Sequence, residues 1–160
     1  MPRGAPPVVR PAEAADVGEV ADLFLASRRD ALPYLPVIHT DDETRRWMAG
    51  VVFPAGGMWV AVLDRRIVGF AALNSGRDHL DHLYVRPGWY GRGIGSVLLE
   101  RAKELSAGRL RLFTFQRNAR ARAFYEARGF AVVDLNDGSR NEEREPDVLY
   151  EWVRVPGAGL

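Results

Sequence analysis

The chain has 160 residues, 47% of them hydrophobic and 27% charged, which is an ordinary composition for one folded domain with its own core. Its 22 basic and 21 acidic residues leave a net charge of +1, which argues against the broad basic surface of a nucleic-acid-binding protein. Because the chain has no cysteine, disulfides, thiolate metal sites and a cysteine nucleophile are excluded.

The N-terminus lacks the apolar core of a signal peptide, and no later segment is apolar over the length of a membrane span. We therefore expect a cytoplasmic protein without membrane contact. No repeat or linker divides the sequence, so we expect a single domain over residues 1–160 with an ordered core from about 8 to 154.

Proline and capping signals define the first elements. Val8–Pro11 predicts a short strand, and Asp16 is a suitable cap for an amphipathic helix that runs to Ala31. Thr40 followed by Glu43 is a capping box, which predicts the start of a second helix.

Most of the later elements are strands. Hydrophobic periodicity predicts a hairpin of strands 58–63 and 67–73, a strand 110–115, a helix 119–128, and strands 130–135 and 148–153. Gly69 in the hairpin indicates a bulge or a close contact. Since several strands follow one another directly, we expect an α/β (α+β) fold with a mixed, mostly antiparallel central sheet flanked by helices.

The most informative stretch is a strand over residues 79–85, a glycine-rich turn and a helix. Pro87 ends the strand, and Gly91, Gly93 and Gly95 precede apolar residues at helical spacing. The helix therefore begins inside the glycine run. There, bare backbone and unpaired N–H groups at the positive end of the helix dipole form an anion site suited to a pyrophosphate.

Two common phosphate-binding loops do not fit this stretch. A dinucleotide fingerprint needs Gly-x-Gly-x-x-Gly, but the last slot holds Ser96 when counted from Gly91 and Leu98 when counted from Gly93. A P-loop needs a Lys-Ser/Thr pair, and the nearest lysine, Lys103, lies well inside the helix. These mismatches argue against a nicotinamide-dependent oxidoreductase.

Residues 90–95, Tyr-Gly-Arg-Gly-Ile-Gly, resemble the acetyl-CoA loop of the GNAT superfamily of N-acyltransferases, Gln/Arg-x-x-Gly-x-Gly/Ala, with Tyr90 in the Gln/Arg slot. Residues 118–130 resemble the family's second signature, an Asn followed by a helix with Phe-Tyr-Glu-x-x-Gly-Phe. Both blocks occur in the family's order, and with the strand pattern the resemblance covers residues 9–153. It implies a GNAT-like fold and acetyl-CoA as the cosubstrate.

The resemblance also implies where the cosubstrate lies. In that family the fourth and fifth strands splay apart, and the pantetheine lies in the gap and pairs with the backbone near the residue that matches Val85. The implied cofactor-binding residues are Leu83, Tyr84, Val85, Tyr90, Gly91, Arg92, Gly93, Ile94, Gly95, Ser96, Asn118 and Arg128.

Acetyl transfer requires proton donors and acceptors. The resemblance places Tyr125 where its phenol protonates the departing CoA thiolate, although a tyrosine at this helical spacing also suits a core. The attacking amine must lose a proton, and His79 and Asp81, which share the strand parity of Val85, match the family's base positions. A water chain, or purely structural roles for those two residues, stay open. Asn118 is equally suited to cap its helix.

In the family, irregular loops wall the acceptor pocket, and here the matching loops are residues 32–39 and 136–146. The acidic residues Glu142, Glu143 and Asp147 either attract a cationic amine or form a solvated charge run.

Several charged residues have less specific roles. Arg120 and Arg122 either meet the CoA phosphates or face water. His39 and His82 favour structural roles, and no histidine and carboxylate cluster has the spacing of a metal site, so we expect no metal.

The sequence thus predicts an N-acetyltransferase that transfers an acetyl group from acetyl-CoA to a primary amine of a small molecule or peptide, by direct attack in a ternary complex. The alternative is a non-catalytic acyl-CoA-binding sensor or regulatory module of the same fold. We expect neither nucleic acid nor membrane as a partner, and a homodimer formed through the last strands stays open.

Overall fold

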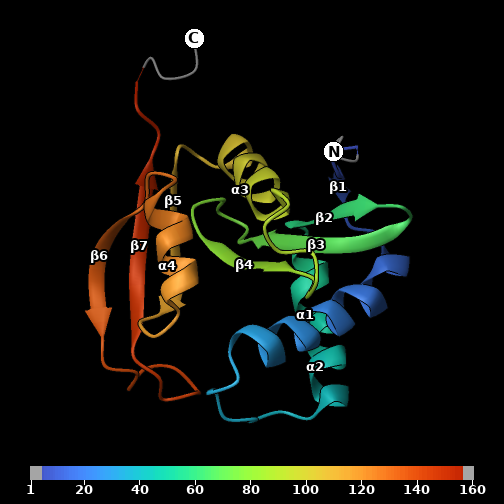
Figure 1. Cartoon of the computed structure of the whole chain (residues 1–160), viewed down its shortest axis with the longest axis horizontal. Coiled ribbons are helices and arrows are strands. Elements are labelled where there is room, and N and C mark those ends of the chain that lie inside the picture. Colours follow the sequence, from blue (N-terminus) through green and yellow to red (C-terminus); the bar gives the residue numbers. More distant parts are fainter. Residues whose placement is uncertain (1–4, 157–160) are drawn as a thin grey trace.

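In the computed structural model, which describes residues 5–156, helices pack against two antiparallel sheets (Figure 1). Residues 1–4 and 157–160 of the predicted domain lie outside the described part. The sheets have the strand orders β1-β2-β3-β4 and β5-β7-β6. The elements are β1 (Val8–Pro11), α1 (Val17–Ala31), α2 (Asp41–Trp47), β2 (Met58–Leu63), β3 (Arg66–Leu73), β4 (Leu80–Val85), α3 (Ile94–Leu105), β5 (Arg109–Phe115), α4 (Ala119–Glu126), β6 (Ala131–Asn136) and β7 (Asp147–Val153).

The predicted mixed, mostly antiparallel fold is confirmed, and most element boundaries agree to within a residue or two. The hairpin turn consists of Asp64 and Arg65, both with positive φ, and β3 therefore begins at Arg66. α4 ends at Glu126 rather than at residue 128, and Gly129, with φ +92°, turns the chain toward β6. No helix within residues 5–156 is long and apolar enough to cross a membrane.

The prediction that the Asp16 side chain caps α1 was wrong. Its carboxylate accepts two hydrogen bonds from Arg10, at 2.7 and 3.0 Å, and one from the Glu13 N–H at 2.7 Å. These bonds form because a short 3₁₀ turn, Ala14–Asp16, precedes the helix and has Glu13 as its cap. The second cap is confirmed: Thr40 Oγ1 accepts from the Glu43 N–H at 3.1 Å, and Glu43 Oε1 accepts from the Thr40 N–H at 2.9 Å.

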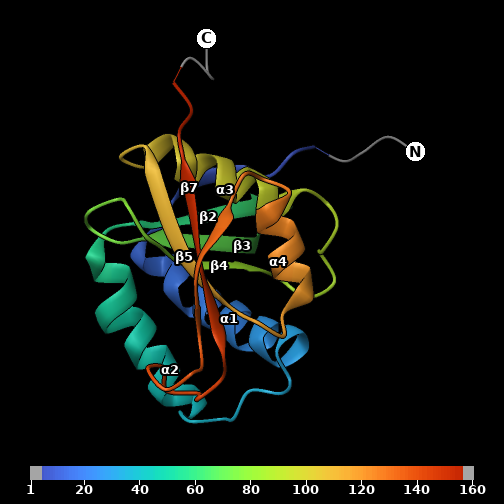
Figure 2. The ribbon, with the colours of Figure 1, turned by 90° about the vertical axis from the view of Figure 1, so that its left-hand side faces the viewer.

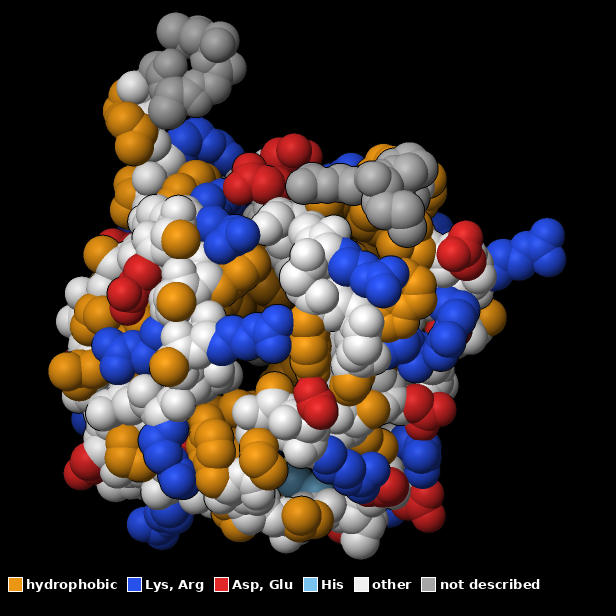
Figure 3. Space-filling model, viewed as in Figure 1, with side chains coloured by type: hydrophobic (Ala, Val, Ile, Leu, Met, Phe, Trp, Pro, Cys, Tyr) orange, Lys and Arg blue, Asp and Glu red, His pale blue; other side chains and the backbone are white. Residues whose placement is uncertain are grey.

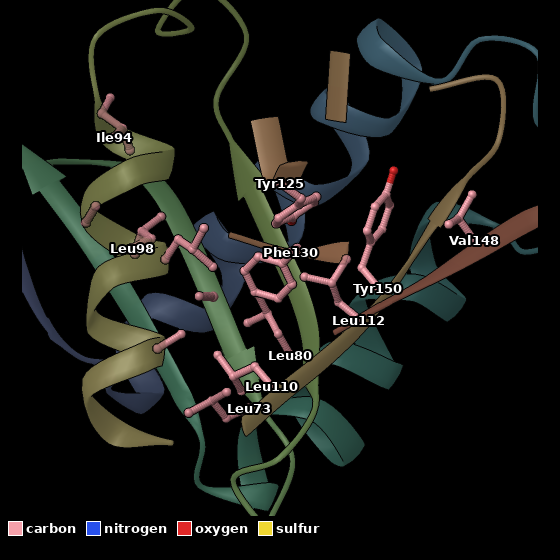
Figure 4. Packing of buried hydrophobic residues seen from close by; sticks show 14 of the residues in the cluster. Leu73, Leu80, Ile94, Leu98, Leu110, Leu112, Tyr125, Phe130, Val148 and Tyr150 are labelled. Atoms are coloured by element: carbon pink, nitrogen blue, oxygen red, sulfur yellow. The ribbon is translucent and has the colours of Figure 1, made fainter. Parts of the chain in front are cut away.

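The N-terminal sheet carries a hydrophobic core on each face. One core packs α1 and the segment after α2 against the sheet, and the other packs α3 and the C-terminal sheet against the opposite face (Figure 4). A Cβ on Gly69 would lie 2.9 Å from the side chains of both Ile94 and Leu98. Glycine at this position therefore lets α3 lie close on β3, which confirms the predicted close contact.

Within residues 5–156, strand pairing joins the two sheets only next to the start of β4. His79 forms a parallel bridge with Arg111, and the Arg111 N–H donates to the Asp78 carbonyl at 2.9 Å. Beyond this bridge, no strand pairing within residues 5–156 joins β4 to β5. β5 crosses in front of β4 at an angle instead of continuing its sheet (Figure 2), and within residues 5–156 the edge of β4 that faces β5 has no strand partner beyond the bridge.

Candidate active site

The loop between β4 and α3 is anchored at its start. The Arg86 N–H donates to the Val68 carbonyl at 2.8 Å, and its guanidinium donates to the Ile67 carbonyl at 2.9 Å and to Glu19 at 3.1 Å. Further along, Gly91 and Gly93 have φ values of +75° and +81°, a region that L side chains rarely adopt. Glycine is therefore required for the path of the loop.

The N-terminus of α3 presents a row of free backbone donors. The first amide of the helix that is hydrogen-bonded is that of Val97, which donates to the Gly93 carbonyl at 3.1 Å. Within residues 5–156, no hydrogen bond engages the N–H groups of residues 91–96. A Cβ on Gly91 or Gly93 would meet nothing within 4 Å, so the backbone is open to a ligand. These residues fit a pyrophosphate.

Three arginines surround this helix end. Arg128 donates to Ser96 Oγ at 2.8 and 3.1 Å and to the Phe124 carbonyl at 2.9 Å, which ties the end of α4 to the start of α3. The guanidinium of Arg92 lies 4.7 Å from the Trp89 ring centroid, and that of Arg120 lies 4.5 Å from the Tyr90 ring centroid.

A fourth arginine faces elsewhere. Arg122 donates to the Tyr150 hydroxyl at 3.0 Å, so it faces β7 rather than the phosphates or open solvent.

Tyr90, in the family's Gln/Arg slot, connects two helices. Its hydroxyl is buried and makes no hydrogen bond within the described residues. Burial raises the pKa of Tyr90, and the neighbouring Asp30 of α1 adds to the rise, whereas Ser27 of α1 opposes it. With Arg120 of α4 over its ring, this side chain lies between α1 and α4.

Tyr125 lies in the core beside the opening between the sheets. It is 8% exposed, and its ring centroid lies 5.1, 5.5 and 6.3 Å from those of Phe124, Phe130 and Tyr150 (Figure 4). Burial, followed by the nearby Tyr84, raises the pKa of Tyr125. The phenol therefore keeps its proton at neutral pH, so the core position predicted for it is compatible with proton donation.

Asn118 caps α4 as the sequence allowed. Its Oδ1 accepts from the Ala121 N–H at 3.1 Å. Its side-chain nitrogen donates to no group within the described residues, so this amide NH₂ group is available to donate to a ligand.

His79 and Asp81 lie together at the closed end of the site. His79 Nδ1 and Asp81 Oδ1 are 2.9 Å apart. The prediction that both share a face with Val85 was wrong, because a bulge leaves Asp81 without a partner on β3 and shifts the alternation. Leu80 packs in the core cluster against which Val85 lies, and the His79 ring contacts Phe113 of β5, with 5.6 Å between centroids.

The remaining two histidines have different surroundings. The His82 ring lies 5.3 Å from that of Trp47 and 6.0 Å from that of Phe24, and burial lowers the pKa of His82 to about 4. His39 is exposed and its Nε2 lies 2.9 Å from Glu142 Oε2, a hydrogen bond that raises the pKa of His39.

A cavity of about 590 Å³ lies between the C-terminal half of α1, residues 32–39, α2 and residues 142–143. Both loops predicted for the acceptor pocket thus line one cavity. Glu143 accepts from Arg28 of α1 at 3.2 Å. Asp147 lies apart from this cavity, because it lines a separate pocket of about 360 Å³ with Phe113 and Arg140.

The sequence reasoning missed several lining residues. Phe24 and Arg28 of α1 and Trp47 of α2 line the cavity, and their spacing in the sequence does not indicate a binding site. Arg117 also went unrecognised: it lies over the Tyr34 ring at 4.0 Å and bonds Glu145 at 2.5 and 2.9 Å. No local pattern identifies such partners, which lie far apart in the sequence.

The space-filling view shows a hollow between α4 and the loop that leads into α3, with a basic side chain reaching across it (Figure 3). This hollow lies where β4 and β5 diverge. Within residues 5–156, no group of three or more His, Asp or Glu side chains has the geometry to hold a metal ion.

The curated proteins that this chain matches include two peptidyl-lysine N-acetyltransferases of bacteria. Peptidyl-lysine N-acetyltransferase YjaB of Salmonella typhimurium is 39% identical over 85 residues, which cover 52% of this chain and only 57% of that protein. Peptidyl-lysine N-acetyltransferase YiaC of Escherichia coli is 26% identical over 148 residues, which cover 92% of this chain and 98% of that protein.

The fold is also known. The solution structure of apo-form YjaB from Escherichia coli matches with a TM-score of 0.76 at 24% identity, over 93% of this chain and 99% of that chain. The model of the acetyltransferase (GNAT) family matches residues 21–130, which include the glycine loop and both Asn118 and Tyr125. The chain therefore belongs to the acetyltransferase (GNAT) family, a family of acetyl-CoA-dependent N-acetyltransferases.

Proposed function

We propose that this protein transfers the acetyl group of acetyl-CoA to the side-chain amine of a peptide lysine, by direct attack in a ternary complex. The observation that carries the proposal is the row of unpaired amides over residues 91–96, at the point where β4 and β5 diverge. The names of the two curated relatives, both peptidyl-lysine N-acetyltransferases, support lysine as the acceptor.

Acetyl-CoA supplies an acyl thioester whose carbonyl carbon the amine attacks. In our proposal the amides of residues 91–96, with Arg92 and Arg128, bind its diphosphate. Residues 83–85 offer the free backbone edge of β4 to the pantetheine, and Asn118 contributes its side-chain nitrogen. Tyr125 donates a proton to the sulfur as the thiolate leaves.

The amine reaches the thioester from the cavity beside α1. His79 and Asp81 do not line that cavity, and they lie at the start of β4, beside the bridge between His79 and Arg111. We therefore propose that solvent in the cavity, rather than either of these residues, takes up the proton of the incoming ammonium.

A two-part experiment tests this function. Acetyl-CoA is expected to raise the melting temperature by mass action, and incubation with lysine peptides is expected to release CoA and add an acetyl group seen by mass spectrometry. The absence of a thermal shift at millimolar acetyl-CoA would contradict the binding site. A thermal shift without CoA release from any amine would instead favour the sensor or regulatory module.

We also propose that two copies pair through the edge strand β6. This strand has no partner on its outer edge within the described residues, and it exposes Val132, Val133 and Leu135. Light scattering tests the proposal: the mass of a dimer is expected, and that of a monomer would contradict it.

A further inference from the structure

The cavity beside α1 has an apolar rim that the fold leaves exposed. Val37 and Ile38, in the loop between α1 and α2, are 88% and 43% exposed and line the cavity together with Leu35 and Trp47. Apolar side chains at the mouth of a cavity contact whatever enters it, and they gain most from an apolar partner.

The charged side chains of the cavity favour a cation. Two arginines and four carboxylates line it, which leaves a balance of −2 when His39 is neutral. The carboxylates are Asp41, Glu43, Glu142 and Glu143. A cleft with a net negative lining raises the local concentration of positively charged groups.

The inner wall of the cavity lies against β4. Phe24 lines the cavity, and its ring centroid lies 5.0 Å from that of Tyr84. Trp47 lines it too, 5.3 Å from the His82 ring. An amine that enters past the apolar rim therefore approaches the strand along which the proposed acetyl donor lies, while the residues next to the amine stay at the rim.

Resting on the proposed function, we propose that the preferred acceptor is a lysine with an apolar residue beside it in the peptide. The lysine enters the cavity, where the negative balance favours its ammonium. The apolar neighbour packs on Val37 and Ile38, which makes these two residues determinants of specificity.

Two capped peptides test the proposal, Gly-Leu-Lys-Leu-Gly and Gly-Asn-Lys-Asn-Gly, because leucine and asparagine have similar size and no charge. Burial of one leucine side chain predicts a kcat/KM about tenfold higher for the leucine peptide, mainly through KM. In Val37→Asn this preference is expected to fall to about threefold or less. Val37 and Val51 are both exposed, so neither substitution should disturb the fold. The matched control Val51→Asn, at a 60% exposed valine outside the cavity, is expected to keep the full preference.

Equal kcat/KM values for the two peptides in the wild-type protein would overturn the proposal, as would an equal loss of preference in Val37→Asn and Val51→Asn. A different result identifies failure of the proposed function itself. In that case acetyl-CoA stabilises the protein, but neither peptide, nor any free amine, causes release of CoA. The proposed acetyl transfer is then contradicted, and the proposed preference for an apolar neighbour is contradicted with it.

Discussion

The two ends of the proposed site are built in different ways. The glycine loop is one continuous segment, and it offers backbone amides, which every residue except proline carries. The cavity is formed by the C-terminal half of α1, the loop after it, α2 and residues 142–143, and it offers side chains. The comparison indicates that the donor end is specified by backbone conformation and the acceptor end by side-chain identity.

Tyr125, between the two ends, should show the largest effect. Tyr125→Phe removes the phenol that we assign as the acid, and kcat is expected to fall by about 100- to 1,000-fold. The Kd of acetyl-CoA and the KM of the peptide should both stay within about twofold, since neither end changes. Because burial raises the pKa of Tyr125, loss of the phenol proton should not lower the wild-type rate up to about pH 10. An unchanged kcat in Tyr125→Phe would remove its role as the acid.

Acid should lower the stability of the fold, because His82, in the wall behind the cavity, is buried in its neutral form. The pKa of His82, about 4, lies below the ordinary value of 6.5, so between these pH values the imidazole is protonated in the unfolded chain and neutral in the folded protein. The contribution of neutral His82 to the free energy of unfolding is therefore fully present above pH 6.5 and is lost as the pH falls toward 4. Between pH 7.5 and 4.5, urea unfolding of the wild type should lose about 2 to 3 kcal/mol more than that of His82→Phe. Equal losses would contradict the burial of a neutral imidazole.

A change to the loop backbone should affect only the donor end. Gly93→Val forces a β-branched side chain into a φ of +81°, and the shifted amides are expected to weaken CoA binding by about 30-fold in calorimetry. The control Gly50→Val introduces the same side chain where a Cβ meets nothing within 4 Å, and it should bind CoA normally. If both variants bind CoA equally well, the loop amides do not bind the diphosphate of CoA.

A single side chain of the cavity should have the smallest effect, and only at the acceptor end. Glu143→Gln removes the charge that pairs with Arg28 and lowers the attraction for a cation, so the KM for the lysine peptide should rise about fivefold. The Kd of acetyl-CoA, measured on the same sample, should stay constant. A change confined to that Kd would reverse the assignment of the two ends.

The sequence predicted the path of the glycine loop and the start of α3 because this signal is local. Gly91, Gly93 and Gly95 lie next to the amides that they expose, so one short segment carries the conformation and the chemistry. The same locality explains the correct Thr40 and Glu43 cap. Sequence reasoning failed in two places. Arg10 donates to the Asp16 carboxylate, which therefore does not cap α1, and the bulge at Asp81 shifts the alternation of side chains along β4.

The acceptor end could not be predicted in detail. Arg28 and Glu143 are 115 residues apart in the sequence, and nothing in either segment indicates that they pair. The resemblance identified the two loops that line the cavity, but which side chains face it depends on how α1 packs on the sheet. Asp147 illustrates the limit, because it lies close to Glu143 in the sequence and yet lines a different pocket.

The most direct test of the account is an amide NMR titration of the uniformly ¹⁵N-labelled protein with CoA. The largest shifts are expected at the N–H groups of residues 91–96, where the structure leaves the donors unpaired. If those amides keep their positions while CoA binds elsewhere, the central claim that they hold the diphosphate is contradicted.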